Sequence, residues 1–81
     1  MSSPVTLLTR ANGCPNCLNV KAVFKALGLD YKEIDVDKDA EEASLLLAKA
    51  TSRSLPLMFD QDENNVAAGL KCIEEGRRYA N

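Results

Sequence analysis

The chain has 81 residues, of which 46% are hydrophobic and 27% charged, with a formal net charge of -2 and an isoelectric point near 5.0. These values are typical of one globular domain, residues 1–81. The acidic balance, with no basic stripe interleaved with aromatic residues, argues against a nucleic-acid surface. No segment has the length of a membrane span, and residues 1–4 lack the features of a secretion signal. We therefore expect a cytoplasmic protein without membrane association.

The first 36 residues predict two strands joined by a helix. Residues 5–9 are rich in β-formers, and a turn-like segment follows at 11–13. Residues 18–27 place apolar side chains at helical spacing, with Gly28 as a C-terminal stop. Residues 31–36 alternate in polarity, which indicates a second strand. Because a helix crosses between them, the two strands should be parallel and the connection right-handed.

A second helix is predicted after Asp39. Its side chain is expected to cap the helix while Glu42 reaches back to it. The inward stripe of this helix is predicted to consist of Ala43, Leu46, Leu47 and Ala50.

The remainder predicts a hairpin and a last helix. Residues 55–59 form a third strand, with Pro56 confined to its start or to an edge because proline donates no ladder hydrogen bond. Residues 60–65 form a polar loop, 66–68 a short fourth strand and 70–79 the last helix. The predicted element order is β-α-β-α-β-β-α.

Acidic side chains concentrate in one part of the chain: Glu33, Asp35, Asp37, Asp39, Glu41 and Glu42. We interpret them as a solvated face rather than as an acidic docking patch.

The segment Cys14-Pro15-Asn16-Cys17 lies where the first strand gives way to the first helix. Pro15 suits the first helical position, which makes Cys14 the cap. The N–H groups of Asn16 and Cys17 then point toward the Cys14 sulfur, and with the helix dipole they lower its thiol pKa from about 8.5 to roughly 3.5–7.5. A Cys-x-x-Cys pair beside a βαβ pattern is typical of a thioredoxin-like redox motif, with Cys14 as nucleophile.

The alternative for this cysteine pair is half of a zinc site, which needs four ligands. The chain has no histidine, and its one further cysteine is Cys72, so we predict no metal site. We interpret Cys72 as a small buried apolar residue of the last helix rather than as a regulatory thiol.

The chain resembles the glutaredoxin family over nearly its whole length. The resemblance lies in the strand–Cys-Pro-x-Cys–helix opening, residues 31–37, the Leu55-Pro56 step and a short hairpin that ends in a glycine before the last helix. It implies a thioredoxin-like (glutaredoxin) α/β fold, with a four-stranded mixed sheet flanked by three helices. It also implies a cis peptide bond between Leu55 and Pro56, beside the Cys14 sulfur.

The resemblance further implies a dithiol–disulfide oxidoreductase in which Cys14 attacks a substrate disulfide and Cys17 resolves the mixed disulfide. No tightly bound cofactor is implied. The implied partners are disulfide-containing proteins, with ribonucleotide reductase as a candidate, and glutathione as co-substrate or thioredoxin reductase as electron source. We expect a monomer. The implied binding residues are Arg10, Pro15, Asn16, Leu55, Pro56, Gly69, Leu70 and Lys71.

Several residues depart from the family pattern. Asn16 stands where many members have Tyr, and Ser54-Leu55 where many have Thr-Val. After the hairpin, residues 67–72 lack the Gly-Gly and Asp of glutathione-using members and are more similar to the glutaredoxin-like electron donors of ribonucleotide reductase. Lys71 would repel the ammonium of glutathione, so we expect weak glutathione turnover.

A non-enzymatic alternative is an adapter of thioredoxin fold or a metal-binding module that shares an iron–sulfur cluster through Cys14 of two chains. Absorbance above 300 nm separates the two, because a cluster is coloured and a dithiol enzyme is not.

Overall fold

The structure, a computed structural model, describes residues 5–80, so the expectation about residues 1–4 lies outside the described part. Its elements are β1 (Val5–Thr9), α1 (Pro15–Leu27), β2 (Tyr31–Asp35), α2 (Ala40–Leu47), β3 (Leu57–Phe59), β4 (Asn65–Ala68) and α3 (Lys71–Ala80). The predicted order of elements is confirmed. Within residues 5–80, no helix combines the length and the apolar composition needed to cross a bilayer.

The four strands form one mixed sheet in the order β2-β1-β3-β4. β1 and β2 are parallel, with Val5 opposite Tyr31 and Thr9 opposite Asp35, as the crossover helix predicted. β3 pairs antiparallel with both β1 and β4. The end of β1, from which the chain continues to the cysteine pair, therefore lies in the middle of the sheet.

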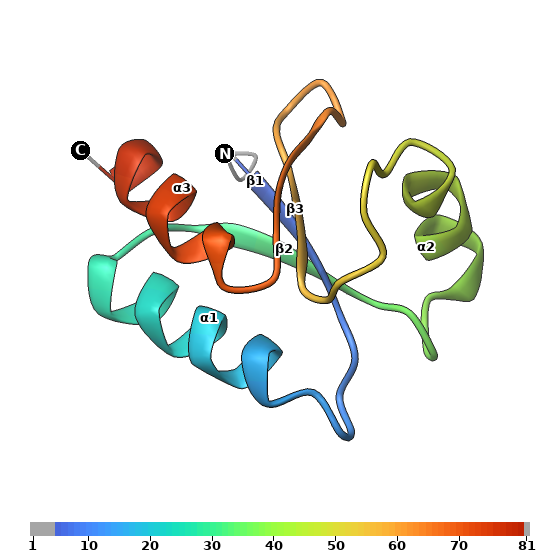
Figure 1. Cartoon of the computed structure of the whole chain (residues 1–81), viewed down its shortest axis with the longest axis horizontal. Helices are drawn as coiled ribbons and strands as arrows, with labels where there is room; N and C mark the ends of the chain where they lie inside the picture. Colours follow the sequence, from blue (N-terminus) through green and yellow to red (C-terminus); the bar gives the residue numbers. More distant parts are fainter. Residues whose placement is uncertain (1–4, 81) are drawn as a thin grey trace.

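The helices cover both faces of this sheet. Figure 1 shows α1 and α3 side by side on one face and α2 on the other. Because successive side chains of a strand point to opposite faces, neighbouring residues enter different cores. Leu7 and Met58 face α1 and α3, whereas Leu8 and Leu57 face α2.

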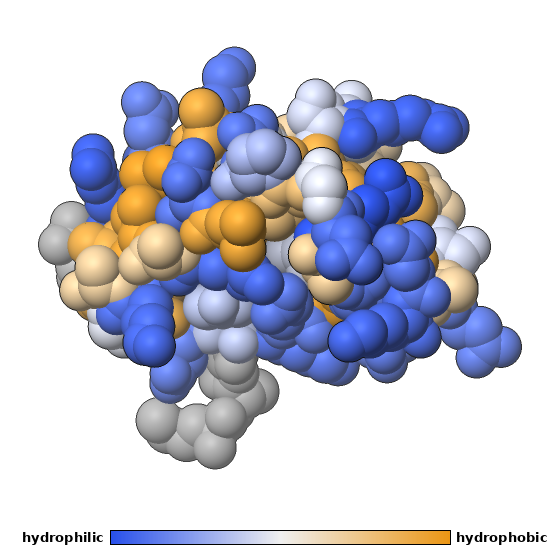
Figure 2. Space-filling model, turned by 90° about the horizontal axis from the view of Figure 1, so that it is seen from below, coloured by the Kyte–Doolittle hydropathy of each residue, from blue (hydrophilic) through white to orange (hydrophobic). Residues whose placement is uncertain are grey.

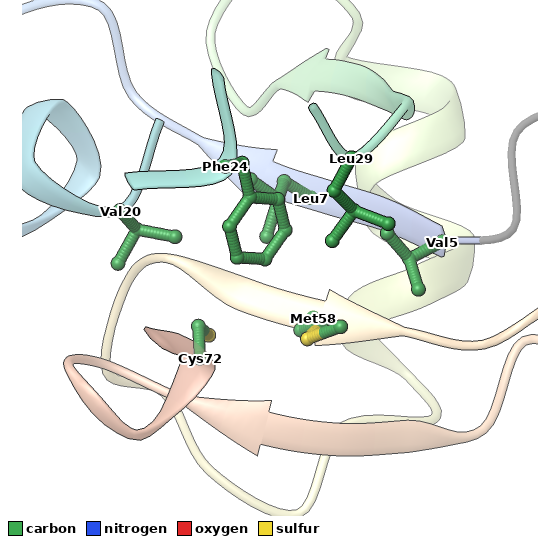
Figure 3. Packing of buried hydrophobic residues seen from close by; sticks show 7 residues of the cluster. All are labelled: Val5, Leu7, Val20, Phe24, Leu29, Met58 and Cys72. Atoms are coloured by element: carbon green, nitrogen blue, oxygen red, sulfur yellow. The ribbon is translucent and has the colours of Figure 1, made fainter. Parts of the chain in front are cut away.

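The core beneath α1 and α3 is aliphatic apart from two aromatic rings. Figure 3 shows its buried members, Val5, Leu7, Val20, Phe24, Leu29, Met58 and Cys72. Phe24 packs edge-on against Tyr31, with ring centroids 5.5 Å apart and an interplanar angle of 79°. Cys72 is fully buried among these side chains, as its interpretation as a small core residue predicted.

The predicted capping box of α2 is wrong. Asp39 does precede the helix, but its Oδ2 accepts a hydrogen bond from the backbone N–H of Asp35 at 3.2 Å instead of capping α2. Glu42 forms an ion pair with Lys32, at 3.3 Å, rather than reaching back. Both carboxylates therefore bind residues of β2. The positions of Asp39 and Glu42 next to the helix in the sequence could not indicate these partners.

The predicted stripe of α2 is right for two of its four members. Ala43 and Leu46 are buried, but Leu47 is 42% exposed and wrongly assigned to the core. Ala50 lies beyond the end of the helix at Leu47 and packs against the core from the following loop. The earlier end of α2 therefore explains why Ala50 reaches the core from a loop, but it does not explain the exposure of Leu47, which lies in the last turn of the helix.

The close packing of α3 on α1 depends on the absence of a side chain at Gly76. A methyl group there would overlap the ring of Phe24, whose Cζ would lie 2.9 Å away. We predict that Gly76→Ala lowers the free energy of unfolding by about 1–3 kcal/mol, the usual cost of overpacking. In an open helix the same change is stabilising by about 0.5–1 kcal/mol, so the sign alone is informative.

The measurement is urea denaturation of Gly76→Ala, of Phe24→Leu and of the double variant. Removing the ring should relieve the overlap, so the double variant should be more stable than the sum of the two single effects. Additive effects, or a Gly76→Ala variant as stable as the parent, would contradict this account of the packing.

Candidate active site

The cysteine pair occupies the start of α1. Cys14 is the N-cap, Pro15 follows at the first position, and the Cys14 Sγ accepts a hydrogen bond from the N–H of Cys17 at 3.2 Å. The sequence also predicted that the N–H of Asn16 points toward the Cys14 sulfur, but the side chain of Cys14 accepts no hydrogen bond from Asn16. The two sulfurs form a disulfide with a Cα–Cα distance of 5.3 Å. Cys17 is buried while Cys14 remains partly exposed, so an incoming reactant meets Cys14 first.

The loop that leads to Cys14 is held by Asp35. Its carboxylate accepts hydrogen bonds from the N–H groups of Asp37 at 2.8 Å, Ala11 at 3.1 Å and Lys38 at 3.2 Å. Asp35 is only 8% exposed, so the interpretation of all six acidic residues as solvated is wrong for this one. The bond from Asp37 lowers the pKa of Asp35, burial opposes it, and the amides of Lys38 and Ala11 lower it further.

A second acidic residue of β2 also has structural partners. The Glu33 carboxylate accepts a hydrogen bond from the Thr9 hydroxyl at 2.7 Å and pairs with Lys21 of α1 at 3.0 Å. Burial raises the pKa of Glu33, but these two contacts outweigh it, so the pKa lies below its ordinary value. This contact links α1 to β1 and β2 behind the cysteine pair.

The peptide bond between Leu55 and Pro56 is cis, which confirms the prediction. The Pro56 carbonyl accepts hydrogen bonds from the N–H of Gly69 at 2.8 Å and from the thiol of Cys72 at 3.5 Å. The loop before β3 is thereby tied to the start of α3.

Two adjoining grooves lie beside the start of α1. The first, which we call the Cys14 groove, has a volume of about 510 Å³ and is lined by residues 13–16 with Arg10, Arg53 and Leu55. The second, which we call the β4 groove, has a volume of about 610 Å³ and is lined by residues 65–71, Asn16, Thr51, Ser52 and Ser54. Asn16 lines both, so the grooves meet beside the motif.

The grooves contain most of the residues that sequence reasoning selected. Arg10, Pro15, Asn16 and Leu55 line the Cys14 groove, and Gly69, Leu70 and Lys71 line the β4 groove. Pro56 and Cys17 line neither, because both are buried beneath the surface.

Sequence reasoning missed the loop of residues 51–54. Arg53 lies in the Cys14 groove, and Thr51, Ser52 and Ser54 lie in the β4 groove. Asn65 fixes the loop, because its side-chain oxygen accepts hydrogen bonds from the N–H and hydroxyl of Thr51 at 2.9 and 3.1 Å. The polar run just before a proline was the available signal, but it was interpreted only as the end of a helix.

The third cysteine is chemically separated from the pair. Burial raises the pKa of the Cys72 thiol to about 12, so it forms almost no thiolate near neutral pH. Among the described residues, no three cysteine, aspartate or glutamate side chains gather as metal ligands.

Comparison with known proteins gives a family. The glutaredoxin family model matches residues 5–63. A probable glutaredoxin of Synechocystis sp. is 35% identical over 52 residues, which cover 63% of this chain. The matched stretch covers 59% of that relative's length, less than two thirds of it.

Solved structures show the same arrangement of elements. The glutaredoxin-like protein NrdH-redoxin from Escherichia coli is 30% identical, with a TM-score of 0.73 and 91% of each chain covered. A mutant of a thioredoxin-like protein is 31% identical, with a TM-score of 0.75, and 95% of this chain and 99% of that one are covered. Glutaredoxin C1 from Populus tremula x tremuloides is 24% identical, with a TM-score of 0.67, and the match covers 94% of this chain and 75% of that one. At this identity the match supports the fold alone.

The pKa of Asp35 generates a prediction about acid stability. A carboxyl whose pKa is lower in the folded chain stabilises the fold above its unfolded pKa of about 3.9, and this contribution is lost as the pH falls through the folded value. We expect Asp35→Asn to be less stable than the parent at pH 7. Its decline in stability between about pH 5 and pH 2 should also be shallower.

Denaturation curves at pH 7, 5 and 3 measure this effect. Asp30→Asn is the matched control, because Asp30 is exposed and its side chain has no hydrogen bond or ion pair within residues 5–80. Equal acid sensitivity of Asp35→Asn and the parent would show that Asp35 does not hold the loop.

The different surroundings of the three thiols predict their order of alkylation. After reduction, iodoacetamide at pH 6 should label Cys14 first, because Cys14 is partly exposed while the other two thiols are buried, and its sulfur accepts the N–H of Cys17. Cys72 should be labelled only after unfolding. Peptide mass spectrometry of quenched samples gives the order, and earlier labelling of Cys17 would reverse the assignment of the nucleophile.

Proposed function

The chain belongs to the glutaredoxin family, and we propose that it is a thiol–disulfide oxidoreductase that acts through Cys14 and Cys17. The observation that carries this proposal is the disulfide at the start of α1, with Cys14 partly exposed in a groove and Cys17 buried behind it. This difference in exposure gives the two sulfurs separate tasks. Cys14 exchanges with substrate, and Cys17 acts within the protein.

The reaction transfers two electrons from the reduced protein to a substrate disulfide. The Cys14 thiolate attacks one substrate sulfur, the substrate S–S bond breaks, and the other sulfur leaves as a thiolate that takes up a proton from water. Cys17 then loses its proton to solvent and attacks the Cys14 sulfur. The mixed disulfide breaks, the second substrate thiol departs, and the Cys14–Cys17 disulfide remains.

The protein around the pair positions this exchange. The N–H of Cys17 reaches the Cys14 sulfur and so favours the thiolate once the disulfide is reduced. Leu55, which lines the Cys14 groove, presents its backbone to the chain that carries the substrate sulfur. Pro56 has no N–H, so it offers the sulfur no competing donor.

The reaction needs a reductant to restore the dithiol. Two molecules of glutathione can serve, leaving as glutathione disulfide, or thioredoxin reductase can pass on electrons from NADPH. The E. coli relative has a thioredoxin-like activity profile, and Lys71 lies in the β4 groove where an acidic residue would serve the glutathione ammonium. We propose thioredoxin reductase as the preferred reductant and ribonucleotide reductase as a candidate substrate. We further propose that the protein is a cytoplasmic monomer without a tightly bound cofactor.

Two measurements test this proposal. The oxidised protein is offered thioredoxin reductase with NADPH, or glutathione with its own reductase and NADPH, and NADPH consumption is followed. Reduction by thioredoxin reductase should be faster. Absence of reduction by either system would contradict an oxidoreductase, and absorbance above 300 nm in freshly purified protein would favour the cluster-binding alternative.

The cysteine variants test the division of tasks. Cys14→Ser should abolish transfer to any disulfide because it removes the attacking sulfur. Cys17→Ser should still form a mixed disulfide at Cys14, detected as an added mass, but should not release a bound protein partner. Retained turnover in Cys14→Ser would show that the order of attack is wrong.

A further inference from the structure

We propose that the substrates of this dithiol are proteins whose disulfide lies in an extended acidic segment, bound by Arg10, Arg53 and Lys71 in the two adjoining grooves. The inference rests on the proposed function, because it names the class of substrate on which the Cys14–Cys17 pair would act.

The lining of the grooves has the opposite charge to the chain as a whole. The chain carries 12 acidic and 10 basic side chains. The Cys14 groove is lined by Arg10 and Arg53 and the β4 groove by Lys71, and no carboxylate lines either one. A local excess of cations around a reactive sulfur attracts anionic segments and raises their rate of encounter.

These cations are available to a partner. Arg53 and Lys71 form no ion pair with any residue between 5 and 80. Arg10 approaches Asp37 at 3.4 Å, but both side chains are more than half exposed, and such a pair contributes little and exchanges readily. The carboxylates of an incoming segment can therefore bind these cations without disrupting the fold.

The shape of the grooves favours an extended chain over a compact ligand. The β4 groove follows the whole of β4, Asn65–Ala68, and then reaches Lys71. Four strand residues at about 3.4 Å each extend roughly 14 Å, which matches several residues of an extended partner. Thr51, Ser52 and Ser54 supply hydroxyl groups along the same groove for the partner's backbone.

Charge rather than apolar contact is the distinguishing feature here. Figure 2 shows a mostly hydrophilic face on which the hydrophobic areas are interrupted by polar side chains. Leu18 and Leu70 are exposed by 62% and 52%, but some exposed apolar side chains are ordinary on a protein surface. Glutathione fits the lining less well than an acidic protein segment, because its ammonium finds no carboxylate in either groove.

The test uses three synthetic peptides that each carry one disulfide, flanked by four aspartates, four serines or four lysines. Reduction by the dithiol form is followed at low and high salt. We expect the acidic peptide to exceed the lysine peptide in kcat/KM by on the order of tenfold in low salt, with the difference shrinking above about 0.5 M salt. Equal rates for all three would overturn the inference and leave the proposed function standing. Failure to reduce any of them would contradict the proposed function itself.

Charge reversals locate the preference. Arg53→Glu and Lys71→Glu should each lower the rate with the acidic peptide several-fold more than the rate with the serine peptide. Lys25→Glu changes the net charge equally, but Lys25 lies 11 residues beyond Cys14, about 16 Å along α1, and lines neither groove. An equal loss in Lys25→Glu would show that net charge, not the grooves, sets the preference, and would overturn the assignment.

Discussion

The hydrogen bond from the N–H of Cys17 to the Cys14 sulfur is the interaction on which the site depends. It forms because Cys14 caps α1, and Pro15 promotes the start of the helix at that point since its missing N–H costs the helix nothing. Gly13, with a φ of 75°, turns the loop into the helix in a conformation that other residues adopt only with strain. Asp35 then fixes the loop from the opposite side by binding the amide of Ala11.

Local signals in the sequence were sufficient for the order of the elements, whereas the four-stranded mixed sheet was implied by the resemblance to the glutaredoxin family. Pro15 and Gly28 mark the ends of α1, and the alternation of polarity in residues 31–36 indicates β2, because each signal acts within a few residues. The capping box of α2 failed for the opposite reason. Asp39 bonds to the backbone of Asp35 and Glu42 pairs with Lys32, and these contacts arise only after β2 and α2 have packed together.

The difference between local signals and contacts that form only on packing also explains which residues of the site could be predicted. The Cys-x-x-Cys spacing at a junction between strand and helix indicated the place of the cysteine pair, whereas the place of Pro56 beside it was implied by the resemblance to the glutaredoxin family. Arg53 carries no such signal. It reaches the Cys14 groove because the loop from residue 51 is held against β4 by Asn65, a contact between residues 14 positions apart. Nothing in the residues next to Arg53 specifies that distant bond.

The three thiols show how one fold separates chemically identical groups. Cys14 is partly exposed and receives an amide N–H, Cys17 is buried within bonding distance of it, and Cys72 is buried with its pKa raised to about 12. Cys72 donates its proton toward the Pro56 carbonyl, which also accepts the N–H of Gly69. A thiol held in this way is a poor nucleophile, so the disulfide exchange that we propose for Cys14 and Cys17 would not extend to the third sulfur, which instead helps to hold the loop beside the pair.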